Sequence, residues 1–279
     1  MVGIFSSSTQ AQIFSIKAMK EAQAKVDQVL EEHKPEDVWI AFDIDMTLVQ
    51  SEHPATYYPA LKKYKDVYKG IIEKLSPLQI DLMHTLLVLT TSQKLVEADI
   101  PHHINFLQER GVRTIAFTAV LSGKLPGYKN KVLVMRREHL QKIGLDFTEK
   151  RTQFPSCMPF KNFPQYGGYF PLLYHGILSS NGERKVSKGQ TFVAFLKHMG
   201  PSYLMKVGKA PYPKVVILVD DRKKNLEDME KALRAYDLSI QFIGLEYQGA
   251  YDYAPTHISK EDFQKFWQAL AEKAKAINL

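Results

Sequence analysis

The clearest pattern along the chain is a set of short, wholly apolar runs separated by longer stretches with helical spacing. Such runs are typical of strands buried on both faces of a parallel sheet. Helical stretches between them favour a doubly wound α/β fold. The expected strands are residues 38–42, 114–117, 215–219 and 239–245. We therefore predict an α/β protein with a doubly wound, mainly parallel, Rossmann-like sheet.

Apolar residues that recur every three or four positions predict the helices. The expected helices are residues 10–33, 59–75, a helix starting at Ser76-Pro77, a helix between Asp99 and Gly111, and residues 131–143, 188–199 and 259–276. The segment 153–182 is rich in Pro, Gly and aromatic residues. We expect this segment to be mostly irregular, with one strand at 172–178.

The stretch between the first two expected strands is unusually long. It holds about 60 residues with helical spacing, whereas a crossover between parallel strands needs roughly a dozen or more. We interpret residues 51–111 as an inserted helical subdomain. Residues 1–50 and 112–279 would then form the α/β core.

Polar side chains follow three of the expected strands. Asp43 and Asp45 follow the first, Thr118 follows the second, and Asp220 and Asp221 follow the third. Ligands of open α/β sheets bind beyond the carboxyl ends of the strands. We therefore expect these side chains to lie together, although each pattern alone is common in proteins.

Two further residues extend this set. Lys188 opens the expected helix at 188–199, and Asn225 lies one helical turn after Asp221. In an extended backbone residues i and i+2 point to the same side, so Asp43 and Asp45 could act on one substrate. A set of carboxylates also suits a hard cation, which prefers oxygen ligands.

The order of these residues resembles that of the haloacid dehalogenase (HAD) superfamily of phosphohydrolases. The segments that resemble its four motifs are FDIDMT, IAFTA, VSKGQ and VILVDDRKKN. The resemblance spans roughly residues 38–247. Within the superfamily, the chain resembles a bacterial group with a helical cap inserted after the first motif. The resemblance implies a HAD-like core, a helical cap, Mg2+ as cofactor and a phosphorylated substrate.

The resemblance also implies catalytic roles. Asp43 would be the nucleophile that forms an aspartyl-phosphate. Asp45 would protonate the leaving oxygen and then activate water. Thr118 would donate a hydrogen bond to a phosphoryl oxygen, and Lys188 would balance the charge of the intermediate.

The same resemblance implies a metal site. Mg2+ would be held by Asp43, by Asp221 and by the backbone carbonyl of Asp45. Asp220 and Asn225 would orient Lys188 or a water on the metal. The cation would neutralise phosphate oxygens and let an anionic carboxylate approach phosphorus.

We expect a Mg2+-dependent phosphomonoester hydrolase. A phosphotransferase with the same intermediate, and a non-enzymatic partner-binding protein on the same scaffold, are the alternatives. Asp45 disfavours dehalogenation, because halide leaves without a proton. Receiver domains of two-component signalling are shorter and present their acids in another order. A D-x-D glycosyltransferase site would leave Thr118, Lys188 and Asp221 unexplained.

Composition narrows the remaining possibilities. The net charge is +7, and the single cysteine, Cys157, excludes an intrachain disulfide and a Cys-based zinc cluster. We find no nucleic-acid-binding motif and no run near the ~18 apolar residues that span a bilayer.

The N-terminus does not read as a signal peptide. We expect a cytoplasmic protein, with export through a trimmed leader or a non-standard route as the alternative. A small metabolite, a nucleotide, a phospholipid headgroup and a phosphoprotein all fit as substrate, and the sequence does not specify the oligomeric state.

Several other residues could face a pocket. His53, Tyr57 and Tyr58 lead from the first motif into the expected insert. The aromatic segment 154–174 could gate the site. We favour packing roles for both groups and a surface position for the histidine pair at 102–103, because two histidines without a third ligand rarely hold a metal.

Overall fold

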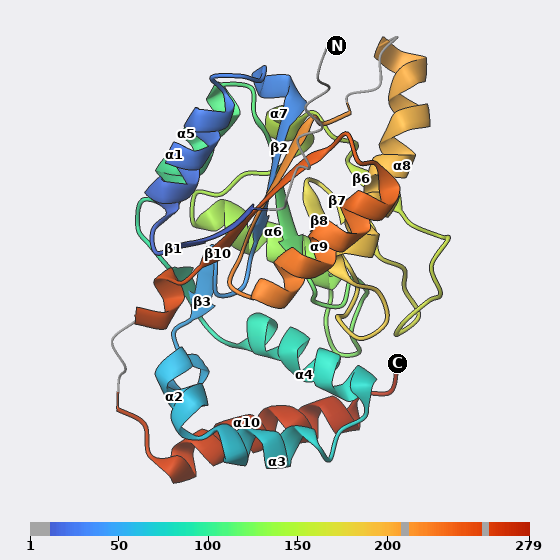
Figure 1. Ribbon diagram of the computed structural model, residues 1–279. Coiled ribbons are helices and arrows are strands. Elements are labelled where there is room, and N and C mark those ends of the chain that lie inside the picture. Colours follow the sequence, from blue (N-terminus) through green and yellow to red (C-terminus); the bar gives the residue numbers. More distant parts are fainter. Residues whose placement is uncertain (1–11, 208–211, 253–256) are drawn as a thin grey trace, which may run out of the picture.

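The centre of the molecule is an eight-stranded, mostly parallel sheet (Figure 1). The computed structural model describes residues 12–207, 212–252 and 257–279. In spatial order the strands are β1 (Gln12–Ile16), β10 (Gln241–Tyr247), β9 (Val215–Asp220), β2 (Val38–Asp43), β5 (Arg113–Thr118), β8 (Ile177–Ser179), β7 (Leu172–Tyr174) and β6 (Cys157–Pro159). Only the β8–β7 and β7–β6 pairs are antiparallel. The predicted α/β class with a mainly parallel sheet is confirmed.

Helices cover both faces of this sheet, as the apolar runs require. Alternate residues of β2 enter two separate core clusters: Ile40 and Phe42 enter one, and Trp39 and Ala41 enter the other. The helices are α1 (Met19–Val29), α2 (Tyr58–Lys63), α3 (Lys65–Ile72), α4 (Pro77–Thr90), α5 (Ile100–Glu109), α6 (Val132–Lys142), α7 (Glu149–Thr152), α8 (Lys188–Val207), α9 (Lys223–Tyr236) and α10 (Lys260–Ala276). Figure 1 shows α1 and α5 on one side of the sheet and α8 and α9 on the other.

A group of helices lies beyond one end of the sheet (Figure 1). It contains α2, α3 and α4, and the C-terminal α10 packs against α3 and α4. Trp267 of α10 donates a hydrogen bond from its indole nitrogen to the Ala55 carbonyl at 3.1 Å. The short antiparallel pair β3 (Val49–Ser51) and β4 (Gln93–Leu95) connects this group to the sheet.

These contacts bear on the expected insert. Helix α5, inside residues 51–111, contacts α1 and β5 of the sheet layer, whereas α10, outside that range, contacts the helical group. The helical group is therefore built from two parts of the chain. The division at residues 51 and 111 stays a prediction.

Two expected elements were wrong. Residues 12–16 of the expected helix at 10–33 form β1, which pairs in parallel with β10, and only α1 is helical there; residues 10 and 11 lie outside the described part. Ile13 and Ile16 suit either element, and pairing with the edge of the sheet decides between them. The expected strand at 172–178 is the hairpin β7–β8, because His175 and Gly176 adopt positive φ angles of 45° and 77°.

The expected single helix at 59–75 is also wrong, because the non-helical backbone at Tyr64 divides it into α2 and α3. Most of the remaining expected elements match closely. The four predicted strands are β2, β5, β9 and β10, each shifted or extended by one or two residues. Ser76 caps α4 by accepting the Gln79 backbone N–H at 3.3 Å, and the Gln79 side chain accepts the Ser76 N–H at 2.9 Å. This reciprocal pair is a capping box. Helix α8 begins at Lys188 as expected and continues to Val207.

Candidate active site

The carboxyl ends of three adjacent parallel strands bring the acidic residues together. In the sheet β2 lies between β9 and β5, so Asp43, the last residue of β2, lies between the ends of its two neighbours. Thr118 ends β5 and Asp220 ends β9. All three residues are buried. Strand order alone therefore places the first, second and fourth sequence motifs at one site.

Lys188 joins two of these carboxylates. Its ammonium lies 2.6 Å from Asp43 Oδ1 and 2.7 Å from Asp220 Oδ2, and the side chain is 3% exposed. Burial lowers the pKa of Lys188, but the carboxylates of Asp220 and Asp43 outweigh burial and hold that pKa above its ordinary value. Lys188 therefore stays protonated at neutral pH and provides a fixed positive charge beside Asp43.

Asp220 is held by a full set of protein donors. Besides Lys188, it accepts hydrogen bonds from the Arg222 backbone N–H at 2.9 Å and from the Asn225 amide at 2.9 and 3.1 Å. Asn225 lies in the first turn of α9. Because these donors occupy its oxygens, Asp220 is suited to orienting Lys188.

Asp43 and Asp221 have fewer compensating charges. Carboxylate oxygens of Asp43, Asp220 and Asp221 all lie within 4.8 Å of one another. Burial, followed by the negative charge of Asp220, raises the pKa of Asp43 well above its ordinary value, and Lys188 only partly opposes this. The same two causes raise the pKa of Asp221 to about 7. Three clustered carboxylates with one ammonium carry an excess of negative charge.

Asp45 lies beside this cluster and has a partner that we did not predict. Arg136 of α6 is 1% exposed and forms an ion pair with Asp45 through one guanidinium nitrogen. Thr118 Oγ1 lies 3.5 Å from the other carboxylate oxygen of Asp45, at the limit of a hydrogen bond. The Asp45 carboxylate is therefore anchored on two sides. Arg136 escaped sequence analysis because its helix carries no motif.

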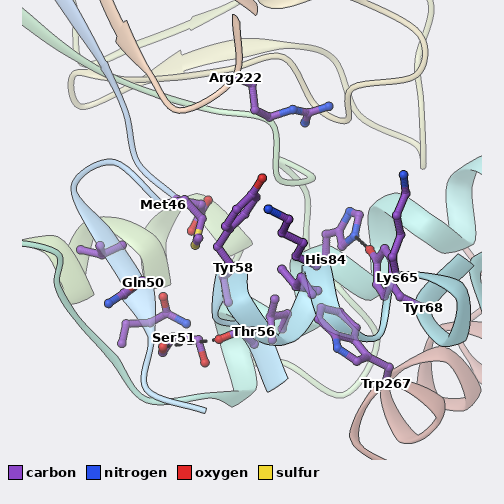
Figure 2. A pocket seen from close by; sticks show the side chains of 17 residues that line it. Met46, Gln50, Ser51, Thr56, Tyr58, Lys65, Tyr68, His84, Arg222 and Trp267 are labelled. Atoms are coloured by element: carbon purple, nitrogen blue, oxygen red, sulfur yellow. Dashed lines mark hydrogen bonds between the residues drawn. The ribbon is translucent and has the colours of Figure 1, made fainter. Parts of the chain in front are cut away.

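The acidic cluster borders a small cavity, and a larger cavity shares part of its wall. The smaller one measures about 200 Å³ and contains Asp43, Asp45 and Asp221 in its wall. The larger one measures about 620 Å³ and lies against α2, α3, α4, β3 and α10 (Figure 2). Residues common to both walls are Asp45, Met46, His84, Leu87, Val88 and Arg222. A substrate bound at Asp43 could extend into the larger cavity.

Two titratable residues of the smaller cavity were also missed. Asp81 accepts a hydrogen bond from the Tyr166 hydroxyl at 2.8 Å, and burial raises its pKa to about 6. His84 lies 2.7 Å from the Tyr68 hydroxyl, and burial lowers its pKa. Both residues are on α4, whose apolar spacing gives no sign that these side chains face a cavity.

His53, Tyr57 and Phe154 have packing or local hydrogen-bonding roles, whereas Tyr166 of the aromatic segment contacts Asp81 in the smaller cavity. His53 stacks on Phe266 at 3.8 Å between ring centroids. The Tyr57 hydroxyl donates to the Glu52 carbonyl at 3.0 Å. Phe154, at the start of the aromatic segment, packs against Trp39 in the core. Tyr58 differs, because it lines the larger cavity and stacks on Tyr251.

The two other positions singled out by sequence, the histidine pair and Cys157, line neither of the two cavities. His103 lies 2.6 Å from the Gln23 side chain and 3.3 Å from Asp99, a half-buried polar contact. Cys157 is exposed at the sheet edge. Among the described residues the carboxylate cluster at Asp43 is the one group of three ligands arranged for a metal ion.

Comparison with known proteins places this chain in a family. The family model described as "Protein of unknown function (DUF2608)" matches residues 15–276. The chain belongs to this family. Apart from the first residues of β1, the match covers the whole sheet. It also covers the candidate active site and the helical group.

Curated relatives of this DUF2608 protein come from Rickettsia, and each is named an uncharacterized protein. A Rickettsia bellii protein is 23% identical over 234 residues, 79% of this chain and 72% of the relative. A Rickettsia conorii protein is 23% identical over 256 residues, 88% of this chain and 80% of the relative. A Rickettsia felis protein is 29% identical over 160 residues, 56% of this chain and 48% of the relative. In the part of the chain that the structure describes, no helix has both the length and the apolar content to cross a membrane.

Proposed function

We propose that this DUF2608 protein is a Mg2+-dependent phosphomonoester hydrolase of the HAD superfamily that acts through an aspartyl-phosphate on Asp43. The observation that carries the proposal is the contact of one buried ammonium, Lys188, with both Asp43 and Asp220 at the ends of adjacent strands. Four segments far apart in the sequence supply this centre, in the order that the resemblance implies.

The residues present fit a divalent cation. Asp43, Asp220 and Asp221 place carboxylate oxygens within 4.8 Å of one another, and oxygen ligands are those that Mg2+ prefers. Burial, followed by the negative charge of Asp220, raises the pKa values of Asp43 and Asp221, and one ammonium only partly opposes this rise. Asp43 and Asp221 would hold the ion, since the oxygens of Asp220 already accept protein donors. A bound Mg2+ supplies charge neutralisation for the phosphoryl group.

The roles of the chain's own residues follow from their positions. The Asp43 carboxylate would attack phosphorus and form the acyl-phosphate bond as the ester oxygen leaves. Asp45 would donate a proton to that oxygen, and then accept one from the water that hydrolyses the acyl-phosphate. Arg136 would keep the Asp45 carboxylate in place, and Lys188 would stabilise negative charge beside Asp43 without moving.

The helical group is our candidate for the cap of this hydrolase. Helices α2, α3 and α4 follow the first motif in sequence, and their residues line the larger cavity next to Asp45. Helix α10 contributes Trp267 to the same wall. Such a cap would bind the organic part of the substrate and keep bulk water from the reacting groups.

Turnover of para-nitrophenyl phosphate with Mg2+ tests this proposal. Asp43→Asn removes the nucleophile with little change in shape, so we expect a loss of about 10^4-fold or more in kcat. Asp66→Asn, on the exposed surface of α3, is the matched control and should leave kcat unchanged. No turnover across a broad panel of phosphomonoesters by the folded wild type would refute the hydrolase.

Two further measurements separate the alternatives. Phosphate released without an added acceptor distinguishes hydrolysis from phosphotransfer. Mg2+ should raise the midpoint of thermal unfolding of the wild type, because a ligand of the native state stabilises it, and Asp221→Asn should abolish that rise. A folded protein with neither turnover nor a Mg2+ response would be a partner-binding protein.

A further inference from the structure

The larger cavity has the size and surface of a site for a small organic molecule. Its volume of about 620 Å³ lies within the range of about 300–1,000 Å³ that is usual for such sites. Most of its wall is apolar, from Tyr58, Leu61, Tyr68, Leu87, Val88 and Trp267. Figure 2 shows Arg222 across the cavity from Thr56 and Trp267. A flat, mostly apolar group would fill this space against aromatic walls.

One polar residue in that wall has unused hydrogen-bonding capacity. Gln50, in the middle of β3, lines the cavity and is 2% exposed. Neither its amide oxygen nor its amide nitrogen has a hydrogen-bond partner among the described residues. Most buried polar groups are paired, and leaving both ends of an amide unpaired costs free energy. A ligand that brings one donor and one acceptor would remove this cost.

Three polar residues near Gln50 in the same cavity wall already have hydrogen-bond partners. Thr56 Oγ1 donates to the His53 carbonyl at 2.7 Å. Ser51 Oγ accepts the His53 backbone N–H at 3.1 Å. Gln93 donates to the Thr91 hydroxyl at 2.8 Å. Among the described residues of this wall, Gln50 is the buried side chain whose amide has no partner at either end.

We propose that the larger cavity binds a nucleobase and that Gln50 recognises its hydrogen-bonding edge, so that the substrate is a nucleoside monophosphate. A nucleobase is flat, stacks on aromatic rings, and presents neighbouring donor and acceptor atoms, which the side-chain amide of glutamine pairs in a bidentate manner. Asp45 and Met46 lie in both cavity walls. The sugar would occupy this junction while the phosphate lies at Asp43. This inference rests on the proposed hydrolase.

The test compares substrates with and without a base. We would measure kcat/KM for the four common ribonucleoside 5′-monophosphates, for ribose 5-phosphate and for para-nitrophenyl phosphate. We expect at least one nucleotide to exceed ribose 5-phosphate by about a hundredfold or more, since a site built to hydrogen-bond a group rejects analogues that lack it. Equal values for ribose 5-phosphate and every nucleotide would overturn the inference and leave the hydrolase standing.

Variants at Gln50 test its role. Gln50→Leu should lower the ratio of nucleotide to ribose 5-phosphate kcat/KM by about tenfold or more. Gln50→Glu keeps the shape but replaces the donor by an acceptor, and should lower the same ratio. Gln268→Leu, on the exposed face of α10, is the matched control and should keep the ratio. A ratio unchanged in both Gln50 variants would refute recognition by this residue.

Binding of nucleosides separates the two proposals. If no phosphomonoester is turned over, para-nitrophenyl phosphate included, the hydrolase fails. Calorimetry with the unphosphorylated nucleosides then decides the inference. Heat of binding in the wild type that disappears in Gln50→Leu would support the base site, and its absence in the wild type would overturn it. Gln50→Leu should fold, because it removes an unpaired amide and keeps a similar volume.

Discussion

Asp81 offers the sharpest test of the electrostatics of the smaller cavity. It is 5% exposed, and burial raises its pKa from 3.8 to about 6. The hydrogen bond from Tyr166 and the positive charge of Arg184, whose Nε lies 3.9 Å away, both oppose that rise. The folded protein therefore binds the Asp81 proton more tightly than the unfolded chain does.

The sign and size of the effect follow by linkage. Because the folded-state pKa is the higher one, the contribution to stability is complete below pH ~4 and is lost as the pH rises through about 6. A gap of about two pH units corresponds to about 3 kcal/mol. Asp81→Asn cannot lose a proton and can still accept the Tyr166 hydrogen bond. The free energy of unfolding of Asp81→Asn should therefore increase relative to that of the wild type as the pH rises.

Urea unfolding at several pH values between 4 and 8 measures this difference. The difference between Asp81→Asn and wild type should rise by about 3 kcal/mol across that range, with most of the change between pH 4 and 6. Asp66→Asn controls for the loss of one negative charge at an exposed position. A difference for Asp81→Asn that stays constant with pH would show that burial does not govern this carboxyl group.

Two further predictions concern Arg136 and Gly176. Arg136→Met should lower kcat for para-nitrophenyl phosphate by about 10–100-fold, because it removes a partner that orients a reacting group. The control Arg151→Met, at an exposed position, should leave kcat unchanged. An unchanged kcat in Arg136→Met would contradict the positioning role of Arg136. Gly176→Ala should destabilise the protein by about 3 kcal/mol in urea unfolding, because φ is +77° and the new Cβ would lie 1.6 Å from the Phe147 carbonyl oxygen. Gly70→Ala, with nothing within 4 Å in α3, should instead gain about 0.5–1 kcal/mol, and an equal effect at both positions would refute the steric argument.

The central strands could be predicted because burial on both faces leaves an unmistakable run of apolar residues. Trp39 and Ile40 are adjacent in β2 and point to opposite cores, so neither can be polar. A strand at the edge of the sheet need not be apolar on both faces. Phe14 of β1 is 38% exposed, and the strand exists because β10 offers an edge for pairing. That partner is distant in the sequence, so local spacing cannot distinguish this strand from a helix.

The residues of the candidate site also fall into those that the sequence could predict and those that it could not. Residues that end strands could be predicted to meet, because parallel strands end at one edge, and Asp43, Thr118 and Asp220 do meet there. Arg136 and Asp81 could not be found, since they reach the site from the sides of helices. The direction of a helical side chain depends on how the helix packs, and that is decided by contacts across the whole chain. Their chemistry is visible only in three dimensions.

The position of Trp267 gives this protein an optical reporter. The chain has two tryptophans: Trp39 is sealed within the sheet core, and Trp267 lies in the wall of the larger cavity. Fluorescence from Trp39 is therefore a constant background, while the emission of Trp267 depends on whether the cavity holds solvent or a molecule. A Trp39→Phe protein would report occupancy of that cavity directly, with no label and no chemical turnover.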